Sequence, residues 1–349
     1  MVQPLLSYLS FRRNLLLSLL SYYPPMRPLI ALFGATASGK TALSLALAER
    51  FGAEILSCDS VAIYRHMQVG TAKPSLEERA RVPHHLLDLY DPDEACTAGD
   101  YSRHGRAALD NLARRNTLPI VTGGTGLYLR ALLDGLFPAP PPDPALRTLL
   151  RQRAARRSPA GLHRTLRRFD PAAAERIHAN DVSKVVRAIE VSLAARRPIT
   201  EQWTTGRDAL TGYSILRLGL APDRAELYTR INRRAAAMFT NGLVEETRRL
   251  IERFGRDRRP FTSLGYAQAA CLLRGEFTEL EAIASAQLGH RHYAKRQTTW
   301  FRREAELHPV EWLRGPGDSP SIIAQAIDLV DAHLAATAVA PQGHPPAGN

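Results

Sequence analysis

The stretch Gly34-Ala-Thr-Ala-Ser-Gly-Lys-Thr41 matches the phosphate-loop pattern G-x-x-x-x-G-K-[ST] at every fixed position. Residues 29–33 before it form a short apolar run typical of a buried strand, and residues 41–50 after it have the pattern of a helix that stops at Gly52. A turn in this position aims backbone N–H groups and the positive end of a helix dipole at an anion. The stretch therefore predicts a phosphate site in an α/β fold, without saying which phosphate compound binds there.

Two side chains of this loop have predicted roles. Lys40 is expected to reach the outer phosphate, and the hydroxyl of Thr41 is expected to hold Mg²⁺. The backbone of the whole loop is expected to surround the phosphates, so the predicted phosphate-binding residues are Gly34, Ala35, Thr36, Ala37, Ser38, Gly39, Lys40 and Thr41.

Two further predicted strands end in chemically informative residues. Ala53-Glu-Ile-Leu-Ser-Cys58 delivers Asp59 and Ser60, and residues 117–122 lead into a second glycine turn, Gly123-Gly-Thr-Gly-Leu-Tyr128. Ligands of open α/β sheets bind outside the carboxyl ends of the strands, so Asp59 should face the phosphate loop. An acid there can bind Mg²⁺, accept a proton, or simply cap the following turn. The second glycine turn predicts a place for another substrate beside the anion.

The composition indicates a polyanionic partner. The 349 residues carry a formal net charge of +12, yet only four of the 46 basic residues are lysine, and the arginine excess is also what a GC-rich coding bias produces. A position that keeps lysine against this trend calls for a compact ammonium. The four lysines are Lys40, Lys73, Lys184 and Lys295.

Other features of the composition indicate a cytoplasmic protein. Cys58, Cys96 and Cys271 are far apart and form no C-x-x-C pair, which argues against a disulfide framework or a zinc cluster. No later segment is apolar for long enough to span a membrane. Residues 1–25 contain a short apolar run after two arginines, without a cleavage site, and we expect either a disordered extension or a misassigned start upstream of Met26.

The sequence Pro83-His-His-Leu-Leu-Asp88 offers two histidines and an acid, which is a possible metal pattern. Adjacent side chains on an extended backbone point to opposite faces, so the pair is not expected to share one ion.

A helical insertion is predicted at residues 138–205. Five prolines between 138 and 144 mark a hinge, and the following stretch is rich in arginine. Asn180 is expected to cap a helix, with Lys184 and Arg187 together on its solvent side. The expected buried face of that helix consists of Val182, Val185, Val186, Ile189 and Leu193.

The rest of the chain is expected to complete a parallel-sheet core made of residues 26–137 and 206–334. Residues 214–220 have the pattern of a returning strand, and Ser263-Leu-Gly-Tyr266 that of a turn with an exposed aromatic. Residues 291–303 interleave six basic residues, counting His292, with aromatics, which suits single-stranded RNA better than an ordinary amphipathic helix. Residues 335–349 are expected to be a disordered tail.

Together these motifs resemble the tRNA dimethylallyltransferase family, also called tRNA isopentenyltransferase, from Met26 to about Leu313. The resemblance rests on an ordered set: Gly34 to Thr41, Asp59-Ser60 with Ile63-Tyr64, Gly70-Thr-Ala-Lys-Pro74, Pro83-His-His-Leu86, Gly123 to Tyr128, Asn180-Asp181 with Arg187, Gly265-Tyr266, and Ala294-Lys-Arg-Gln-Thr-Thr-Trp-Phe-Arg302. All four lysines lie in or beside these motifs. The implied fold is a P-loop NTPase-like parallel sheet flanked by helices, with a small all-helical insertion domain.

The resemblance implies transfer of the dimethylallyl group of dimethylallyl diphosphate to N6 of adenine 37, next to the anticodon, in tRNAs that read codons beginning with U. It implies Mg²⁺ as cofactor, the tRNA anticodon stem-loop as partner, and no membrane; we expect a monomer. The catalytic residues implied are Asp59 as the base, Lys40, Thr41, Thr125 and Arg187, the last with a role at either the tRNA or the diphosphate.

By the same resemblance, one set of residues contacts tRNA: Asp59, Ser60, Val61, Ala62, Thr125, Arg147, Ser183, Lys184, Val185, Val186, Arg187, Gly265, Tyr266, Lys295, Arg296, Gln297, Thr298, Thr299, Trp300, Phe301 and Arg302. The chain departs from the family pattern at Ala62, Ala267 and His292, which bears on anticodon-loop recognition. Three other functions share part of these features: a small-molecule phosphate-loop kinase, a prenyltransferase acting on free adenine nucleotides, and an RNA-binding protein with a decayed loop. The first two do not need the arginine-rich insertion, and the third does not need Lys40, Thr41 and Asp59.

Overall fold

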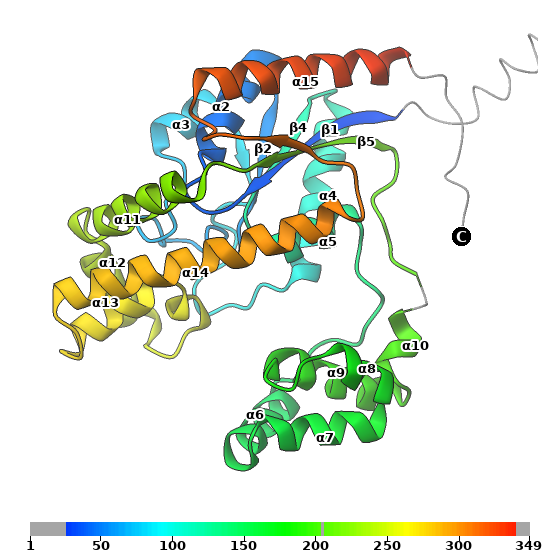
Figure 1. Ribbon diagram of the computed structural model, residues 1–349, viewed down its shortest axis with the longest axis vertical. Helices are drawn as coiled ribbons and strands as arrows, with labels where there is room; N and C mark the ends of the chain where they lie inside the picture. The colour runs from blue at the N-terminus through cyan, green and yellow to red at the C-terminus, as the bar shows by residue number, and fades with distance from the viewer. Residues whose placement is uncertain (1–25, 204–205, 340–349) are drawn as a thin grey trace, which may run out of the picture. The chain divides into compact units, whose positions relative to one another are not determined.

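The computed structural model describes residues 26–203 and 206–339, and their strands form a single parallel sheet (Figure 1). The strand order is β3-β2-β4-β1-β5-β6, and every pairing is parallel. This confirms the predicted fold class, a parallel sheet flanked by helices. The strands are β1 (Arg27–Gly34), β2 (Glu54–Cys58), β3 (His84–His85), β4 (Pro119–Gly123), β5 (Tyr213–Leu220) and β6 (Glu311–Leu313).

Helices cover the sheet, and the side chains of β1 alternate between its two faces. Ile30 and Leu32 join a core cluster with α2 and α15, whereas Phe33 stacks on Phe301 of α14 with 4.6 Å between ring centroids. Figure 1 shows α14 as a long helix running past the strands. The helices of this part are α2 (Lys40–Phe51), α3 (Leu76–Arg81), α4 (Ala98–Arg114), α5 (Gly126–Leu133), α11 (Arg224–Thr240), α12 (Leu243–Phe254), the 3-10 helix η1 (Arg259–Thr262), α13 (Tyr266–Leu273), α14 (Glu279–Ala305) and α15 (Pro320–Val339).

The phosphate loop connects β1 to α2 as predicted, and its glycines are required by close contacts. Gly39 has a φ of 91°, and a Cβ there would lie 2.5 Å from the backbone nitrogen of Gly317. That nitrogen donates a hydrogen bond to the carbonyl of Ser38 (2.9 Å). The loop is therefore braced by a segment near the other end of the chain.

The second glycine turn begins where two strands touch. Gly123 ends β4 in register with Cys58 of β2, and a Cβ on Gly123 would lie 2.0 Å from the Cys58 carbonyl oxygen. Only glycine fits at this position without moving the neighbouring strand. The close approach brings the residues that follow both strands together at one edge of the sheet.

The C-terminal part of the chain contains two elements that the sequence did not reveal. β6 adds an edge strand beside β5, and α15 packs its Ile322, Ala326 and Val330 into the core cluster. Since α15 continues to Val339, the predicted disordered tail is wrong for residues 335–339. Residues 1–25 and 340–349 lie outside the described residues, so the remaining predictions on both ends are untested.

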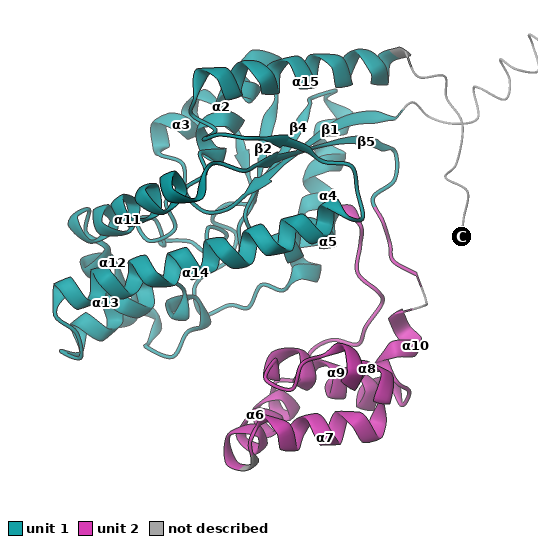
Figure 2. Ribbon diagram, in the orientation of Figure 1, with its two compact units in different colours: residues 1–132, 210–349 teal, residues 133–209 magenta. Residues whose placement is uncertain are grey.

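The chain divides into two compact units, residues 1–132 with 210–349 and residues 133–209 (Figure 2). The small unit has its own apolar core, which includes Leu162, Leu166, Val185 and Ile189. It corresponds to the insertion expected at 138–205. Its helices are α6 (Pro144–Arg157), α7 (Pro159–Phe169), α8 (Pro171–Arg176), α9 (Val182–Ala195) and α10 (Ile199–Trp203). Within residues 26–203 and 206–339, no helix has the length and apolar character needed to cross a membrane.

Details of α9 differ from the prediction. Asp181, not Asn180, caps the helix, because its Oδ1 accepts a hydrogen bond from the Lys184 amide (3.2 Å). Leu193 lies in the last turn of the helix, before the left-handed cap at Arg196, and is 42% exposed. The predicted buried face is thus correct at its centre and wrong at its end.

Arg187 does not share the solvent side with Lys184, because it binds the buried carboxylate of Glu190. Glu190 is 1% exposed and accepts hydrogen bonds from Arg187 (2.5 Å), from two nitrogens of Arg147 (both 2.9 Å), and from the amide of Asp143 (2.7 Å). Arg187 also donates to the carbonyl of Pro140 (3.0 Å). This cluster ties the proline-rich segment to α9.

Glu190→Gln should destabilise the small unit by about 2 kcal/mol at pH 7, because two guanidinium groups lose their carboxylate. Burial opposes ionisation, but the hydrogen bonds from Arg147 and Arg187 outweigh it and hold the pKa of Glu190 below its usual value. The stabilisation is therefore present at neutral pH and disappears as the pH falls below about 4. Thermal unfolding of both proteins at pH 7 and in acid measures this.

The matched control is Glu175→Gln on α8, which removes the same charge from an exposed position of the same unit. It should leave the unfolding temperature unchanged. Equal stability of the wild type and Glu190→Gln at pH 7 would contradict the structural role of the cluster.

Candidate functional site

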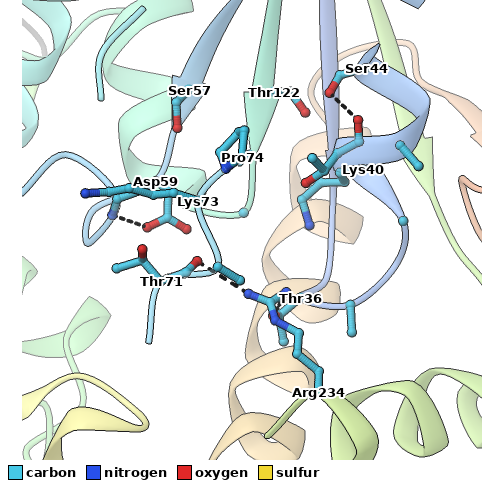
Figure 3. Close-up of a pocket in the computed structure, with 18 of the residues that line it drawn as sticks. Thr36, Lys40, Ser44, Ser57, Asp59, Thr71, Lys73, Pro74, Thr122 and Arg234 are labelled. Atoms are coloured by element: carbon cyan, nitrogen blue, oxygen red, sulfur yellow. Dashed lines mark hydrogen bonds between the residues drawn. The ribbon is translucent and has the colours of Figure 1, made fainter. Parts of the chain in front are cut away.

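A pocket of about 620 Å³ lies at the carboxyl ends of the strands. Figure 3 shows Lys40, Asp59, Lys73 and Arg234 around it, from four separate segments of the large unit. Its lining comprises residues of the phosphate loop and α2, Ile55, Ser57, Asp59, Ala62, residues 71–74, Glu78, His84, residues 122–124, Arg230, Arg233, Arg234, Ala237, Tyr293, Gln297 and Asp318. The sheet topology thus places the predicted acid and the phosphate loop on one cavity.

Lys40 is held at the mouth of the phosphate loop. Its Nζ donates to the carbonyl oxygens of Gly34 (3.0 Å) and Ala35 (2.7 Å). Burial and, second, the positive charge of Arg234 lower the pKa of Lys40 to about 7. The side chain is therefore poised to gain a proton when an anion arrives.

Arg234 is a functional residue that the sequence did not reveal. From α11 it donates to the hydroxyl of Thr36 in the phosphate loop (3.3 Å) and to the carbonyl of Thr71 (3.5 Å). One turn earlier, Arg230 donates to the carbonyl of Ala37 (3.0 Å). Arg230 and Arg234 are four residues apart and so lie on one face of a helix, but many other arginines of this sequence have a similar spacing. The spacing alone therefore did not distinguish them.

Asp59 has the capping role that was one of its three predicted roles. Its Oδ1 accepts hydrogen bonds from the amides of Val61 (2.8 Å) and Ala62 (3.0 Å), so the carboxylate does cap the following turn. It also lines the pocket (Figure 3). Among the described residues, its second oxygen makes no hydrogen bond. That oxygen is available to accept a proton from a substrate.

Thr125 of the second glycine turn lies beside Asp59. Its Oγ1 accepts a hydrogen bond from the amide of Ser60 (3.1 Å) and is 3.4 Å from the Ser60 hydroxyl. Nearby, burial and then the charge of Asp59 raise the pKa of Tyr293 to about 12. Thr125 of the second turn and Tyr293 of α14 therefore present hydroxyl groups, rather than another charge, near the acid.

The residues around Thr41 fit a divalent cation with oxygen ligands. Thr41 lines the pocket, and so does Thr122, whose hydroxyl is buried without a hydrogen-bond partner in the described part of the chain. Hydroxyl, carboxylate and phosphate oxygens are the ligands that Mg²⁺ prefers.

The predicted RNA-binding segment lies within α14, where some of its side chains are buried and others are exposed. Gln297 and Phe301 are buried, and Gln297 binds the amide of Thr36 and the carbonyl of Gly124, each at 2.8 Å. Trp300 lies under the guanidinium of Arg130, 4.7 Å from ring to cation. Among the predicted tRNA contacts 295–302, the exposed side chains are Lys295, Arg296, Thr299 and Arg302. For Phe301 the predicted tRNA contact is therefore corrected to a structural one, whereas Gln297 both joins the two loops and lines the pocket.

Burial corrects three further predicted tRNA contacts. Tyr266 is fully buried, because its hydroxyl donates to Glu246 (2.6 Å), so it is not the exposed aromatic expected. Val185 and Val186 fill the core of the small unit. Ser183 and Lys184 of the same helix are exposed.

The two adjacent histidines have separate partners. Nδ1 of His84 lies 2.7 Å from the carbonyl of Val82, and Nε2 of His85 lies 2.7 Å from the carboxylate of Glu54. Glu54 also binds Arg115. The pair faces two different environments, which argues against a shared metal.

This arrangement is typical of one class of protein, a phosphate-loop enzyme in which the phosphate loop and an acid line the same pocket. Two family models match the chain, IPP transferase over residues 62–304 and Isopentenyl transferase over residues 27–88. The chain belongs to the tRNA dimethylallyltransferase family.

Individual relatives support this assignment over most of the chain. The tRNA dimethylallyltransferases of Koribacter versatilis and Solibacter usitatus are 58% and 52% identical, over 86% and 87% of this chain and 97% and 98% of theirs. The solved tRNA isopentenylpyrophosphate transferase of Bacillus halodurans is 35% identical with a TM-score of 0.64, covering 89% of this chain and 98% of that one. A eukaryotic dimethylallyltransferase acting on tRNA shares the fold, with a TM-score of 0.74 at 23% identity, over 88% of this chain and 80% of that one.

The lowered pKa of Lys40 predicts that anion binding depends on pH. Only the protonated side chain attracts a phosphate, so the affinity for an alkyl diphosphate should fall about tenfold as the pH rises from about 7 to about 8.5. Binding at the higher pH should take up a proton. Titration calorimetry in two buffers of different ionisation enthalpy measures both effects.

Lys40→Met is the control, since it lacks the titrating group. It should bind the diphosphate weakly at both pH values and take up no proton at Lys40. If the affinity of the wild type for the diphosphate stays constant between pH 7 and about 8.5, the lowered pKa of Lys40 is contradicted.

Proposed function

We propose that this chain transfers the dimethylallyl group of dimethylallyl diphosphate to N6 of adenine 37 in tRNAs that read codons beginning with U, releasing diphosphate. The observation that supports this most directly is the shared pocket: the phosphate loop with Lys40 occupies one wall, and Asp59 occupies another. A diphosphate and an amine acceptor can therefore be held together. The names of the relatives supply the identity of the two substrates.

The acceptor nitrogen needs a base. The lone pair of an exocyclic adenine amine is delocalised into the ring, so its proton must leave as the new C–N bond forms. The free oxygen of Asp59 is the acceptor for that proton, while the bonds from Val61 and Ala62 fix the other oxygen. The hydroxyl of Thr125 lies beside Asp59 and can orient its carboxylate. The adenine must be turned out of the anticodon loop to reach this point.

The leaving diphosphate needs positive charge. As the allylic C–O bond breaks, negative charge grows on the diphosphate, and preorganised cations and N–H donors stabilise it. Lys40, Arg230 and Arg234 surround the phosphate loop and supply these groups. Bound Mg²⁺, held by Thr41, would neutralise part of the same charge. Arg187 is assigned no step, because Glu190 and Pro140 occupy its guanidinium.

The same proposal extends to partner and location. The exposed arginines of α6 and α7, among them Arg151, Arg153 and Arg164, give the small unit a surface suited to the backbone of the anticodon stem. Three free cysteines fit a reducing cytoplasm, and we propose that the protein acts there as a monomer.

The deciding experiment is incubation of the protein with Mg²⁺, dimethylallyl diphosphate and unmodified tRNA, followed by mass analysis of the nucleosides. We expect a dimethylallyl mass gain on adenosine. Modification of free AMP but not of tRNA would favour the nucleotide prenyltransferase, and hydrolysis of ATP without prenyl transfer would favour a kinase.

Asp59→Asn separates the base from the structural cap. The amide oxygen can still accept the bonds from Val61 and Ala62, but the side chain can no longer take a proton. The rate of the chemical step should fall about a thousandfold, with the affinities for tRNA and diphosphate within about threefold of wild type. Single-turnover kinetics measures the rate. A rate within tenfold of wild type would remove Asp59 as the base.

The exposed cations of α14 are predicted to bind RNA phosphates. Replacing Lys295 and Arg296 by alanine should weaken tRNA binding and reduce the slope of log affinity against log salt by nearly two. Anisotropy titrations across a salt series measure this slope. The control replaces Arg248 and Arg249 of α12, which pair with Glu245. An unchanged slope in the α14 variant would exclude these residues as phosphate contacts.

A further inference from the structure

Glu246 of α12 binds three successive backbone amides of a distant loop. Its carboxylate accepts hydrogen bonds from the N–H groups of Gln68 (3.0 Å), Val69 (3.0 Å) and Gly70 (3.4 Å). Hydrogen bonds to an ionised acceptor are about twice as strong as neutral ones. This arrangement fixes the backbone of the loop and leaves little of the charge of Glu246 unmatched.

Tyr266 completes the contact from a second helix. Its hydroxyl donates to the same carboxylate (2.6 Å), and burial together with the charge of Glu246 raises its pKa, so the phenol stays a neutral donor. Its ring packs so closely on Gly70 that a Cβ there would lie 2.4 Å from the ring carbon Cε2. The carboxylate and the ring thus hold one end of the loop.

The other end of this loop is also fixed. Lys73 has a fully buried side chain, which donates to the carboxylate of Asp88 (2.7 Å) and to the carbonyl of Tyr64. Between the two fixed ends, residues 71–74 form one wall of the diphosphate pocket, and the carbonyl of Thr71 receives Arg234. Neither Glu246 nor Tyr266 lines that pocket.

We propose that Glu246 and Tyr266 are positioning residues for the diphosphate donor. They hold residues 68–74 in place, and through Thr71 they set the guanidinium of Arg234 against Thr36 of the phosphate loop. The inference rests on the proposed function for the identity of the donor. A purely structural role would lower stability and leave the affinity for the donor unchanged.

The test is Glu246→Gln, compared with Tyr266→Phe. Glutamine keeps the shape but offers one acceptor oxygen, and its amide group opposes the N–H donors of the loop. We expect the KM for dimethylallyl diphosphate to rise about tenfold, with kcat at saturating donor and the Kd for tRNA within about twofold. Tyr266→Phe keeps the ring packing and loses one bond, so its KM should rise about threefold.

Binding of dimethylallyl diphosphate without tRNA, measured by calorimetry, gives a readout that does not depend on turnover. The affinity for the donor should fall about tenfold in Glu246→Gln and about threefold in Tyr266→Phe. Unchanged affinity in two folded variants would overturn the inference, even if their unfolding temperatures fall. If wild type binds the donor but transfers nothing to tRNA, the proposed function fails, while this comparison still tests the positioning role.

The matched control is Glu245→Gln. Glu245 is the neighbouring residue on α12, and its carboxylate pairs only with Arg248 and Arg249 on the surface among the described residues. The Glu245→Gln substitution removes one negative charge, as Glu246→Gln does, from the adjacent position in the chain. A rise in KM equal to that of Glu246→Gln would attribute the effect to charge and overturn the positioning role.

Discussion

The site depends on one buried amide group. The side chain of Gln297 accepts a hydrogen bond from Thr36 and donates one to Gly124, so it spans the phosphate loop and the second glycine turn. A primary amide can do this because it has a donor and an acceptor at a fixed separation. A charged side chain of similar size would lose one of the two bonds and leave a buried polar group unsatisfied. The distance between the phosphate loop and the second glycine turn is therefore set by a residue on α14.

The electrostatics of the pocket follow from the burial of positive charge. Burial and then the charge of Arg234 lower the pKa of Lys40, burial lowers the pKa of Arg234, and the charge of Asp59 offsets part of both effects. A protein interior bears such an imbalance at a cost, and functional sites are where it is found. A dianionic ligand removes it. The same contacts that weaken the free pocket thus favour a diphosphate over a neutral molecule.

Local patterns predicted the parts of this protein that local chemistry determines. The phosphate loop, its flanking strand and helix, the position of Asp59 and the second glycine turn all follow from short motifs. The burial of Tyr266 could not be predicted, because its partner Glu246 lies elsewhere in the chain. Arg234 was missed for a similar reason: only the packing of α11 against the loop distinguishes it from other arginines. The capping of α9 by Asp181 instead of Asn180 is a one-residue error of the kind that adjacent capping residues permit.

The bracing of the phosphate loop by Gly317 has a consequence for synthesis of the protein. β1 is made first, but its partner β5, the amide of Gln297 and the backbone of Gly317 are made much later. On the ribosome, the emerging chain holds an incomplete sheet with an unsupported loop until residue 317 has left the exit tunnel. The small unit has its own core and needs none of these later residues. The nascent chain can therefore fold its arginine-rich insertion before it has a finished catalytic pocket.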